Sequence, residues 1–238
     1  MDKIISAKNL IKKYDDTLAL DQVSLEIYQG EVVGILGPNA SSKTTLLKAL
    51  AGIIRLDQGE VKINDRPITF KDYGQIVYMP DKDILFDYYT IKDHLSYFRD
   101  MYEDFDYDLS NKYLDYFHLD NKKLSKNLSK GDYKKLMISL YLARDAKIYF
   151  LDEILDGIDP ISIAKVIDMI IEKIDGTRTF LIASHQINEV ENIFDRVIFL
   201  NKGSLYESID LKDFREDNNL SVADFYEEIY FGWLWENF

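Results

Sequence analysis

The sequence predicts an α/β fold with a mostly parallel central sheet and helices on its faces. The continuous apolar run Val32–Leu36 has the length and composition of a strand that is buried on both faces, and Lys147–Leu151 has the pattern of a second buried strand. Two later apolar runs, Thr179–Ala183 and Arg196–Leu200, alternate with stretches of helical periodicity. This alternation of strands and helices is typical of parallel sheets. The 238 residues, 47% of them apolar, suffice for one sizeable domain with subdomains.

The first third of the chain predicts mainly strands. The exception is Thr44–Ala51, which has the pattern of a helix that ends at Gly52. The expected strands are Ile4–Lys8, Val23–Ile27, Val32–Leu36, a hairpin edge over Gly59–Arg66 that turns at Asn64-Asp65, and Ile76–Met79, which Pro80 stops. From Thr90 to Leu142 the pattern changes to helical periods. This block is therefore expected to be a helical insert.

Composition excludes several classes of function. No run of about 18 apolar residues occurs, so no membrane span is expected. Met1–Asp16 is charged throughout and lacks the apolar core of a secretory signal. The chain has no cysteine, which excludes disulfide and thiolate chemistry and fits a cytoplasmic protein. The net charge of −13, without an evident basic face, predicts that nucleic acid is not a partner.

The segment Ile35–Thr45 has the pattern of a phosphate-binding loop. It lies between a predicted buried strand and a predicted helix, which is the context such loops require. In the usual pattern, G-x-x-x-x-G-K-[ST], backbone N–H groups surround phosphates, the lysine reaches the terminal phosphates and the hydroxyl binds Mg²⁺. Gly37, Lys43 and Thr44 match this pattern, but Ser42 replaces the second glycine.

A pair of carboxylates follows the second buried strand. Asp152 and Glu153 come directly after Lys147–Leu151, and strand ends of parallel sheets line the ligand crevice. Asp152 is placed to hold a Mg²⁺ that bridges phosphates, and Glu153 to polarise an attacking water. An acidic cap on the following helix is the alternative interpretation.

Two further segments have polar residues where phosphates would lie. Ser129 and Gly131 precede a predicted helix, Tyr133–Arg144, and its positive end could bind an anion. An ordinary helix cap at Ser129 is the alternative. His185 follows the apolar strand Thr179–Ala183 and is placed to contact a γ-phosphate, although a single histidine is often structural.

Together, in this order and on these strand ends, the segments resemble the nucleotide-binding subunit of ATP-binding cassette (ABC) transporters. The resemblance runs from about Ile4 to Tyr206, and Leu128–Gly131 is its most specific mark. It implies a P-loop NTPase core, an N-terminal antiparallel β subdomain and an inserted helical subdomain over about residues 82–144. Residues 1–206 would form one ATPase domain, and residues 207–238 an acidic and aromatic helical tail.

The resemblance also implies a role for each matching residue, with ATP and Mg²⁺ as ligands. Tyr14 would stack on adenine. The phosphates would be wrapped by Gly37, Pro38, Asn39, Ala40, Ser41, Ser42, Lys43, Thr44 and Thr45. The metal would be held by Thr44, Asp81 and Asp152, and catalysis would use Glu153 as general base, with Lys43, Asp152 and His185. Ser129 and Gly131 would close over the ATP of a second cassette, and Gly157–Asp159 would couple the two sites.

Four positions depart from the commonest family pattern. Ala40 and Ser42 replace glycines, and Asp81 and Asp132 replace glutamines. An acidic residue at position 81 has precedent in ABC-2-type exporters, and a carboxylate can still contact Mg²⁺ or its water. If Ser42 has a positive φ, its side chain costs about 1–2 kcal/mol, which would weaken ATP binding without abolishing it.

The function expected from the resemblance is that of an ATP-hydrolysing exporter subunit. It would energise a separate multi-span permease from the inner face of the cell membrane, paired with an identical or different second cassette. The sequence is similar to ABC-2-type subunits of low-GC Gram-positive bacteria, which suggests export of, or resistance to, antimicrobial or amphipathic peptides. The alternatives are a slow regulatory cassette beside a competent partner, and a non-transport ABC ATPase without a permease.

The tail carries one further pattern. Apolar residues recur at helical spacing between Val222 and Leu234, which predicts a helix with one broad apolar face. Such a face is expected to pack on its own domain. Contact with a dimer mate or another partner is the alternative.

Overall fold

A computed structural model describes residues 2–82, 84–217 and 220–232 of the chain. Its centre is a six-stranded sheet with the strand order β10-β9-β3-β8-β7-β6. The strands are β3 (Val32–Leu36), β6 (Ile76–Met79), β7 (Ile148–Asp152), β8 (Thr179–Ala183), β9 (Arg196–Asn201) and β10 (Ser204–Asp210). All neighbouring pairs are parallel except β9 and β10. The predicted mostly parallel sheet is therefore confirmed.

A second, antiparallel sheet is formed near the N-terminus, with the order β2-β1-β4-β5. Its strands are β1 (Lys3–Tyr14), β2 (Thr17–Tyr28), β4 (Gln58–Ile63) and β5 (Arg66–Pro67). The hairpin between β4 and β5 turns at Asn64 and Asp65, as predicted, and both residues have a positive φ. The predicted lengths of the first two strands were wrong, because each strand runs for twelve residues. Irregular pairing around Asn9 and Gln22, which also have positive φ, interrupts the alternation of apolar residues that would have revealed the full strands.

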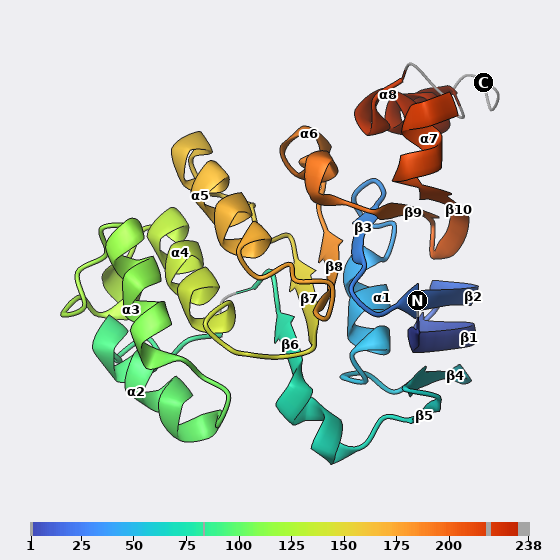
Figure 1. Cartoon of the computed structure of the whole chain (residues 1–238). Coiled ribbons are helices and arrows are strands. Elements are labelled where there is room, and N and C mark those ends of the chain that lie inside the picture. Colours follow the sequence, from blue (N-terminus) through green and yellow to red (C-terminus); the bar gives the residue numbers. More distant parts are fainter. Residues whose placement is uncertain (1, 83, 218–219, 233–238) are drawn as a thin grey trace.

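Helices cover the central sheet, and Figure 1 shows three of them gathered on one side of the molecule. These three, α2 (Ile91–Met101), α3 (Tyr107–Tyr116) and α4 (Lys130–Tyr141), lie in the chain between β6 and β7. The other helices are α1 (Lys43–Leu50), α5 (Pro160–Ile171), α6 (Ile187–Val190), α7 (Leu211–Asp217) and α8 (Val222–Glu227), which continues as a π-helical turn over Glu228–Gly232. Shorter 3₁₀ turns occur at Phe70–Gln75, Ser125–Asn127 and Glu191–Ile193. No helix in the described ranges has the length and apolar character needed to cross a membrane.

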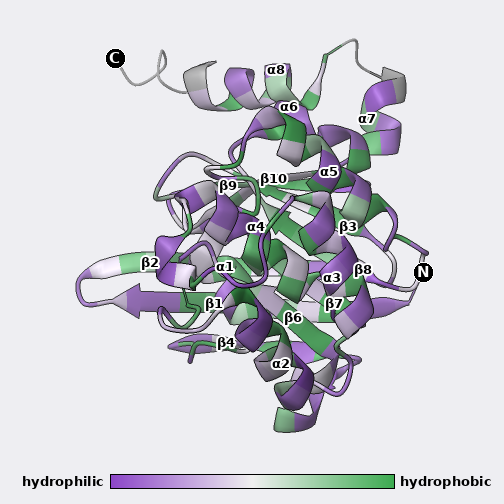
Figure 2. Ribbon diagram, turned by 90° about the vertical axis from the view of Figure 1, so that its left-hand side faces the viewer, coloured by the Kyte–Doolittle hydropathy of each residue, from purple (hydrophilic) through white to green (hydrophobic). Residues whose placement is uncertain are grey.

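The central sheet separates two hydrophobic cores. One core joins helices α2 to α5 to one face of the sheet, and the other joins α1 and the antiparallel sheet to the opposite face. Figure 2 shows the hydrophobic residues concentrated in the central strands. The strands β3, β7 and β8 are buried along their whole length, which explains their uninterrupted apolar sequences. The sheet is thus a rigid support for the loops at its edge.

The described part of the tail packs on its own chain. Val222 and Ile229 are buried in the larger core, and the ring of Phe225 lies 5.6 Å from that of Phe199 on β9. The hydroxyl of Tyr230 donates a hydrogen bond to the carbonyl of Leu200 at 2.7 Å. Trp233 and Leu234, the last residues of the predicted apolar face, lie outside the described residues. The strand β10 was not predicted, because it lies at the sheet edge and is only partly buried.

Candidate functional site

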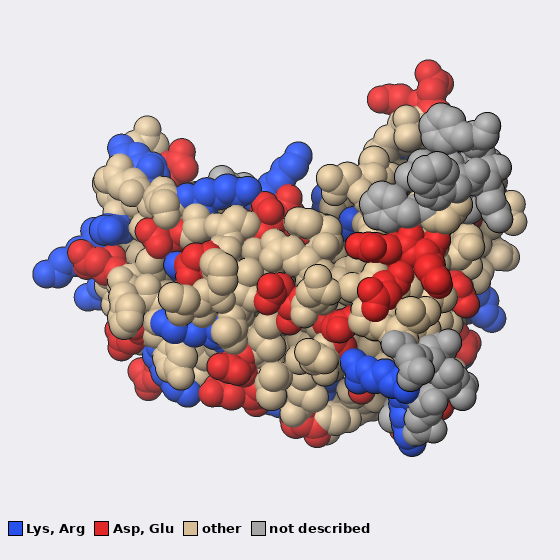
Figure 3. All heavy atoms as spheres, turned by 90° about the horizontal axis from the view of Figure 1, so that it is seen from above, with Lys and Arg blue, Asp and Glu red and all other residues tan. Residues whose placement is uncertain are grey.

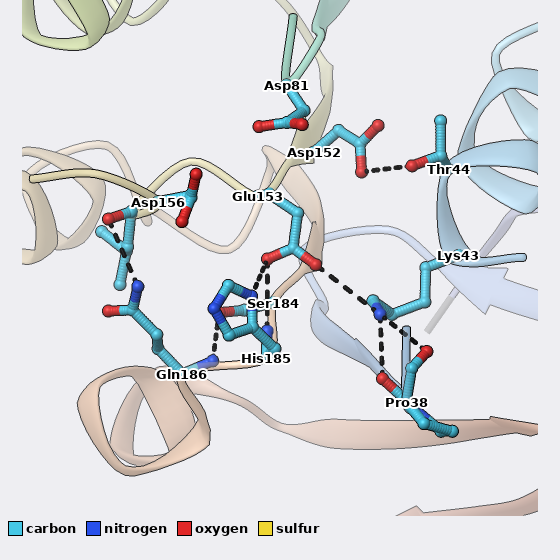
Figure 4. Close-up of polar contacts among 12 residues, drawn as sticks. Pro38, Lys43, Thr44, Asp81, Asp152, Glu153, Asp156, Ser184, His185 and Gln186 are labelled. Carbon is cyan, nitrogen blue, oxygen red and sulfur yellow. Dashed lines mark hydrogen bonds and ion pairs between the residues drawn. The ribbon is translucent and has the colours of Figure 1, made fainter. Parts of the chain in front are cut away.

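Several of the side chains predicted from the sequence, among them Lys43, Asp152 and His185, lie at one edge of the central sheet (Figure 4). The strands β3, β8, β7 and β6 are parallel neighbours, so their carboxyl ends meet at this edge. The loop before α1 follows β3, and Asp152 is the last residue of β7. His185 follows β8, and Asp81 follows β6. The topology therefore gathers residues that are more than a hundred positions apart in the sequence.

The loop between β3 and α1 contains two strained residues. Ala40 has a φ of 63° and Ser42 a φ of 79°, both in the left-handed region that favours glycine. The conformation is held by the loop itself, since Ser41 N donates to Pro38 O at 3.1 Å and Leu46 N donates to Ser42 O at 2.9 Å. The positive φ at Ser42, on which the sequence-based estimate of strain depended, is therefore present.

Gly37 begins this loop at a position where the structure leaves no room for a side chain. A Cβ atom there would lie 2.4 Å from Leu200 O and 2.5 Å from Ser41 Oγ. Ser41 Oγ is itself a buried polar atom without a hydrogen-bond partner among the described residues. A close backbone approach and an unsatisfied hydroxyl are both suited to a loop that surrounds an anion.

Lys43 connects this loop to the carboxylates on β7. Its side chain is buried, and Nζ donates to Gly37 O at 2.8 Å and to Pro38 O at 3.3 Å. Nζ also lies 3.6 Å from Glu153 Oε1. The ammonium group is thus held in the loop with an acidic group on its other side.

Asp152 is a buried carboxylate held by two hydroxyl groups. Thr44 Oγ1 donates to Asp152 Oδ1 at 3.0 Å, and the hydroxyl of Tyr78, on β6, donates to Oδ2 at 3.3 Å. Burial raises the pKa of Asp152, whereas the hydrogen bond from Thr44 opposes this shift. Mg²⁺ in nucleotide sites is usually held by one or two carboxylates together with the phosphates. A threonine hydroxyl beside an aspartate fits such an ion.

Glu153 and His185 form a close pair next to Asp152. His185 Nδ1 lies 2.8 Å from Glu153 Oε2, and the backbone N–H of His185 donates to the same oxygen at 3.2 Å. Glu153 has a φ of 48°, an uncommon value for a non-glycine residue. Strain of this kind is concentrated at functional sites. The two oxygens of Glu153 therefore face Lys43 on one side and His185 on the other.

Asp81 lies near this group but pairs with a residue that sequence reasoning missed. Its carboxylate lies 3.4 Å from Nζ of Lys134, a buried lysine on α4. The charge of Asp81 still acts on Asp152, since it contributes to raising the pKa of that residue. The sequence did hold one sign of Lys134. It is a basic residue on a helix face whose other residues are buried, and this indicates that it has an acidic partner.

The remaining predicted residues lie outside the contacts of Lys43. Ser129 caps α4, and its hydroxyl accepts a hydrogen bond from Asp132 N at 3.1 Å. The first turns of α4 are joined to the segment after Glu153, because Lys130 pairs with Asp156 at 2.8 Å and Lys135 with Asp159 at 2.7 Å. The cap predicted as the alternative for Ser129 is thus present, and it leaves the residue exposed.

Tyr14 lies at the end of β1, where the antiparallel sheet turns into β2. It pairs with Thr17 across the hairpin, and its ring is about half exposed. Nζ of Lys12 lies 5.0 Å from the centre of this ring. An exposed aromatic ring next to a cation suits a flat ligand such as a base.

Comparison with models of protein families shows to which family this chain belongs. Residues 20–156, more than half of the chain, match the family model described as ABC transporter. The chain belongs to the ABC transporter family. It is an ABC ATPase, the ATP-binding subunit that energises a transmembrane permease.

Relatives of this ABC ATPase occur in bacteria and archaea. The chain is 32% identical to the ABC transporter ATP-binding protein YtrB of Bacillus subtilis, over 90% of the chain and 74% of that protein. It is 33% identical to the ABC transporter ATP-binding protein MJ1023 of Methanocaldococcus jannaschii, over 84% of the chain and 74% of that protein. It is 29% identical to LptB of Escherichia coli, the ATP-binding protein of a lipopolysaccharide export system, over 84% of the chain and 88% of LptB.

Solved structures agree on the fold. An ATP-binding subunit of an ABC transporter superposes with a TM-score of 0.82 at 23% identity, covering 94% of this chain and 98% of that one. The ADP conformation of the cassette MJ1267 gives a TM-score of 0.75 at 23% identity, covering 98% of this chain and 100% of that one. These similarities support the ABC ATPase fold, with its antiparallel N-terminal sheet and mostly parallel central sheet.

Replacing Ser42 by glycine should tighten the binding of Mg-ATP by at most about thirtyfold. Glycine removes a penalty of about 1–2 kcal/mol for the positive φ at this position. Isothermal titration of the natural chain and of Ser42→Gly measures the difference. Asn64→Gly is the matched control, because Asn64 also has a positive φ but lies in the β4–β5 turn. Equal affinities for Ser42→Gly and the natural chain would show that the strain does not act on binding.

Proposed function

We propose that this ABC ATPase hydrolyses Mg-ATP with Glu153 as the general base. The observation that carries this proposal is the position of Glu153, with Oε2 2.8 Å from His185 Nδ1 and Oε1 3.6 Å from Lys43 Nζ. A base in this position can accept a proton from water beside the phosphate that Lys43 contacts. His185 orients the carboxylate and reaches toward the same phosphate. The strained backbone at Glu153 supports this role.

The same edge of the sheet would hold the nucleotide and its metal ion. The segment Gly37–Thr45 surrounds the phosphates with backbone N–H groups and the N-terminus of α1. Thr44 and Asp152 would hold Mg²⁺, which would supply neutralisation of phosphate charge. Asp81, paired with Lys134, would add negative charge near the metal. Tyr14 stacks on the adenine.

A second cassette would complete the site. Ser129 and Gly131 are exposed or half-buried at the N-terminus of α4, on contacts separate from those of Lys43. In this position they are free to close over ATP bound to a partner cassette. The segment Gly157–Asp159 is joined to α4 through Lys135, and so links the two sites. In this arrangement residues 1–206 act as one ATPase domain with a helical subdomain at about 82–144, and residues 207–238 as its tail.

The permease would bind at the segment Ile84–Tyr89, here named the permease-docking segment. Four of its six residues are large, apolar or aromatic, and exposed, namely Ile84, Phe86, Tyr88 and Tyr89. Exposed apolar groups of this density mark protein interaction sites. A cytoplasmic helix of the permease is the occupant that an ABC ATPase subunit requires. The cassette would then lie on the inner face of the cell membrane.

Export is the direction of transport that the residues favour. Asp81 stands where ABC-2-type exporters often carry an acidic residue, and the similarity to LptB, an export ATPase, supports the same direction. Antimicrobial or amphipathic peptides remain the proposed cargo. Figure 3 shows Lys and Arg scattered among acidic and uncharged side chains on the face seen from above. Such a surface supports the prediction that nucleic acid is not a partner.

Tyr88→Ser should weaken binding to the permease by about tenfold or more. Tyr88 is 78% exposed in the permease-docking segment, and tyrosines at the centre of an interface often dominate its affinity. Binding of the purified cassette to its permease, held in lipid nanodiscs, measures the effect. Phe70→Ser is the matched control, because Phe70 is 79% exposed but lies outside this segment, in the 3₁₀ turn Phe70–Gln75. A loss with Phe70→Ser and none with Tyr88→Ser would place the interface elsewhere.

A further inference from the structure

A buried histidine lies directly beneath the permease-docking segment. His94 is on the first turn of α2, its side chain is fully buried, and both of its ring nitrogens have hydrogen-bond partners. Nδ1 lies 2.9 Å from Thr90 O, and Nε2 lies 3.0 Å from the backbone nitrogen of Phe86. Neither contact belongs to the nucleotide site. The residue therefore needs a separate explanation.

The partners of His94 determine its protonation state. A carbonyl oxygen can only accept, so Nδ1 carries the proton that is donated to Thr90 O. A backbone N–H can only donate, so Nε2 must be unprotonated to accept from Phe86. Ser125 agrees with this assignment, because its hydroxyl donates to Tyr89 O at 3.1 Å and can accept from Nδ1 at 3.2 Å. His94 is therefore neutral, with its proton on Nδ1.

Three buried or half-buried side chains hold the backbone of the permease-docking segment. The hydroxyl of Tyr133, on α4, accepts from Leu85 N at 2.7 Å. His94 accepts from Phe86 N, and Ser125 donates to Tyr89 O. The rings of Phe86 and Tyr89 also lie 6.3 Å and 5.4 Å from the imidazole. The aromatic side chains that face outward are thus fixed from beneath.

We propose that His94, in its neutral form, is a positioning residue that holds the permease-docking segment in its binding conformation. The inference rests on the proposed function, because it assumes that the permease binds at this segment. Protonation of Nε2 would set one N–H against the N–H of Phe86, and the contact would break. The aromatic side chains of the segment would then lose their fixed arrangement. Docking, but not nucleotide chemistry, would be affected.

The surroundings of His94 keep it neutral at ordinary pH. Burial lowers the pKa of His94 below its usual 6.5, and the hydrogen bond to Thr90 O and the charge of Asp93 oppose this shift. The other groups that face the ring are Tyr89 from the docking segment and Ser125 from the 3₁₀ turn. Because the folded-state pKa is lowered, the contact is intact above about pH 6.5 and is lost as the pH falls through the lowered pKa.

The test compares two variants of His94 in the permease-binding assay. His94→Gln keeps an acceptor for Phe86 N but has no titratable group, so it should bind like the natural chain at pH 7.5 and lose less affinity on acidification. His94→Leu leaves that N–H unpaired and should bind about fivefold or more weakly, with ATP binding unchanged. His118→Gln is the control, because His118 is exposed in the turn that follows α3.

Each outcome bears on the proposal. Full affinity of a folded His94→Leu variant would overturn it, and so would an acid sensitivity of His94→Gln equal to that of the natural chain. If His94→Leu does not fold, the pH comparison with His94→Gln decides alone. Normal binding by Tyr88→Ser would instead contradict the proposed docking site. Failure of the inference and failure of the proposed function are therefore distinguished.

Discussion

Glu153→Gln should retain ATP binding and lose at least about a hundredfold in turnover number. General base catalysis contributes about 10²- to 10⁴-fold, and glutamine cannot accept the proton from water. The substitution preserves the shape of the side chain, so the loop around Lys43 and the contacts of His185 remain in place. Steady-state ATPase rates give the turnover number, and isothermal titration gives the affinity for Mg-ATP.

Glu172→Gln is the matched control for this experiment. Glu172 caps α5 and makes an exposed ion pair with Lys112, 3.7 Å away, so its loss should leave both rate and affinity unchanged. Undiminished turnover in Glu153→Gln would exclude this residue as the base. Loss of ATP binding in the same variant would instead mean that the carboxylate is needed to hold Lys43.

Arg144→Met should lower the free energy of unfolding by about 3–5 kcal/mol, the usual cost of removing one partner from a buried ion pair. Arg144 is buried between the helical insert and the central sheet. Its guanidinium donates to both oxygens of Asp104 at 3.0 Å and to Ile76 O, on β6, at 3.1 Å. It also lies 4.0 Å from the centre of the Tyr102 ring. Methionine keeps most of the volume but leaves Asp104 without its cation.

Urea unfolding of the natural chain and the variant measures this loss. Arg99→Met is the control, because Arg99 pairs with Asp100 at 3.1 Å on the surface, where ion pairs contribute about 0–1 kcal/mol. A similar, small effect for both variants would mean that Asp104 finds water or another partner. The helical insert would then be held to the sheet mainly by apolar contacts.

The site was predictable from the sequence because its residues stand at the ends of strands. Buried parallel strands are continuous apolar runs, so the positions of Asp152, Glu153 and His185 were visible without a structure. Parallel pairing then brings them to one edge. The strain at Ser42 was also foreseeable, because a glycine in the usual motif implies a positive φ. The structure adds the distances between these residues, whose roles in nucleotide binding and hydrolysis stay predictions.

Other features depend on contacts between segments and left little trace in the sequence. The pairing of Asp81 with Lys134 joins residues 53 positions apart and has no local pattern. In the sequence, His94 has the pattern of an ordinary helical residue. Its contact with the preceding loop, through the backbone N–H of Phe86, is visible only in the folded chain. The strands β1 and β2 were predicted too short because bulges disturb their alternation. In each case the feature depends on a residue of another segment, which a local sequence pattern does not include.

The role of this chain is tested most directly by its ATP turnover, measured for the cassette alone and assembled with its permease in lipid vesicles. We expect the complex to hydrolyse ATP faster than the isolated chain, and Glu153→Gln to abolish turnover in both. A slow regulatory cassette would instead leave activity to a different partner subunit, so Glu153→Gln would not reduce the rate of the complex. Equal rates with and without the permease would contradict the claim that ATP hydrolysis by this chain energises transport.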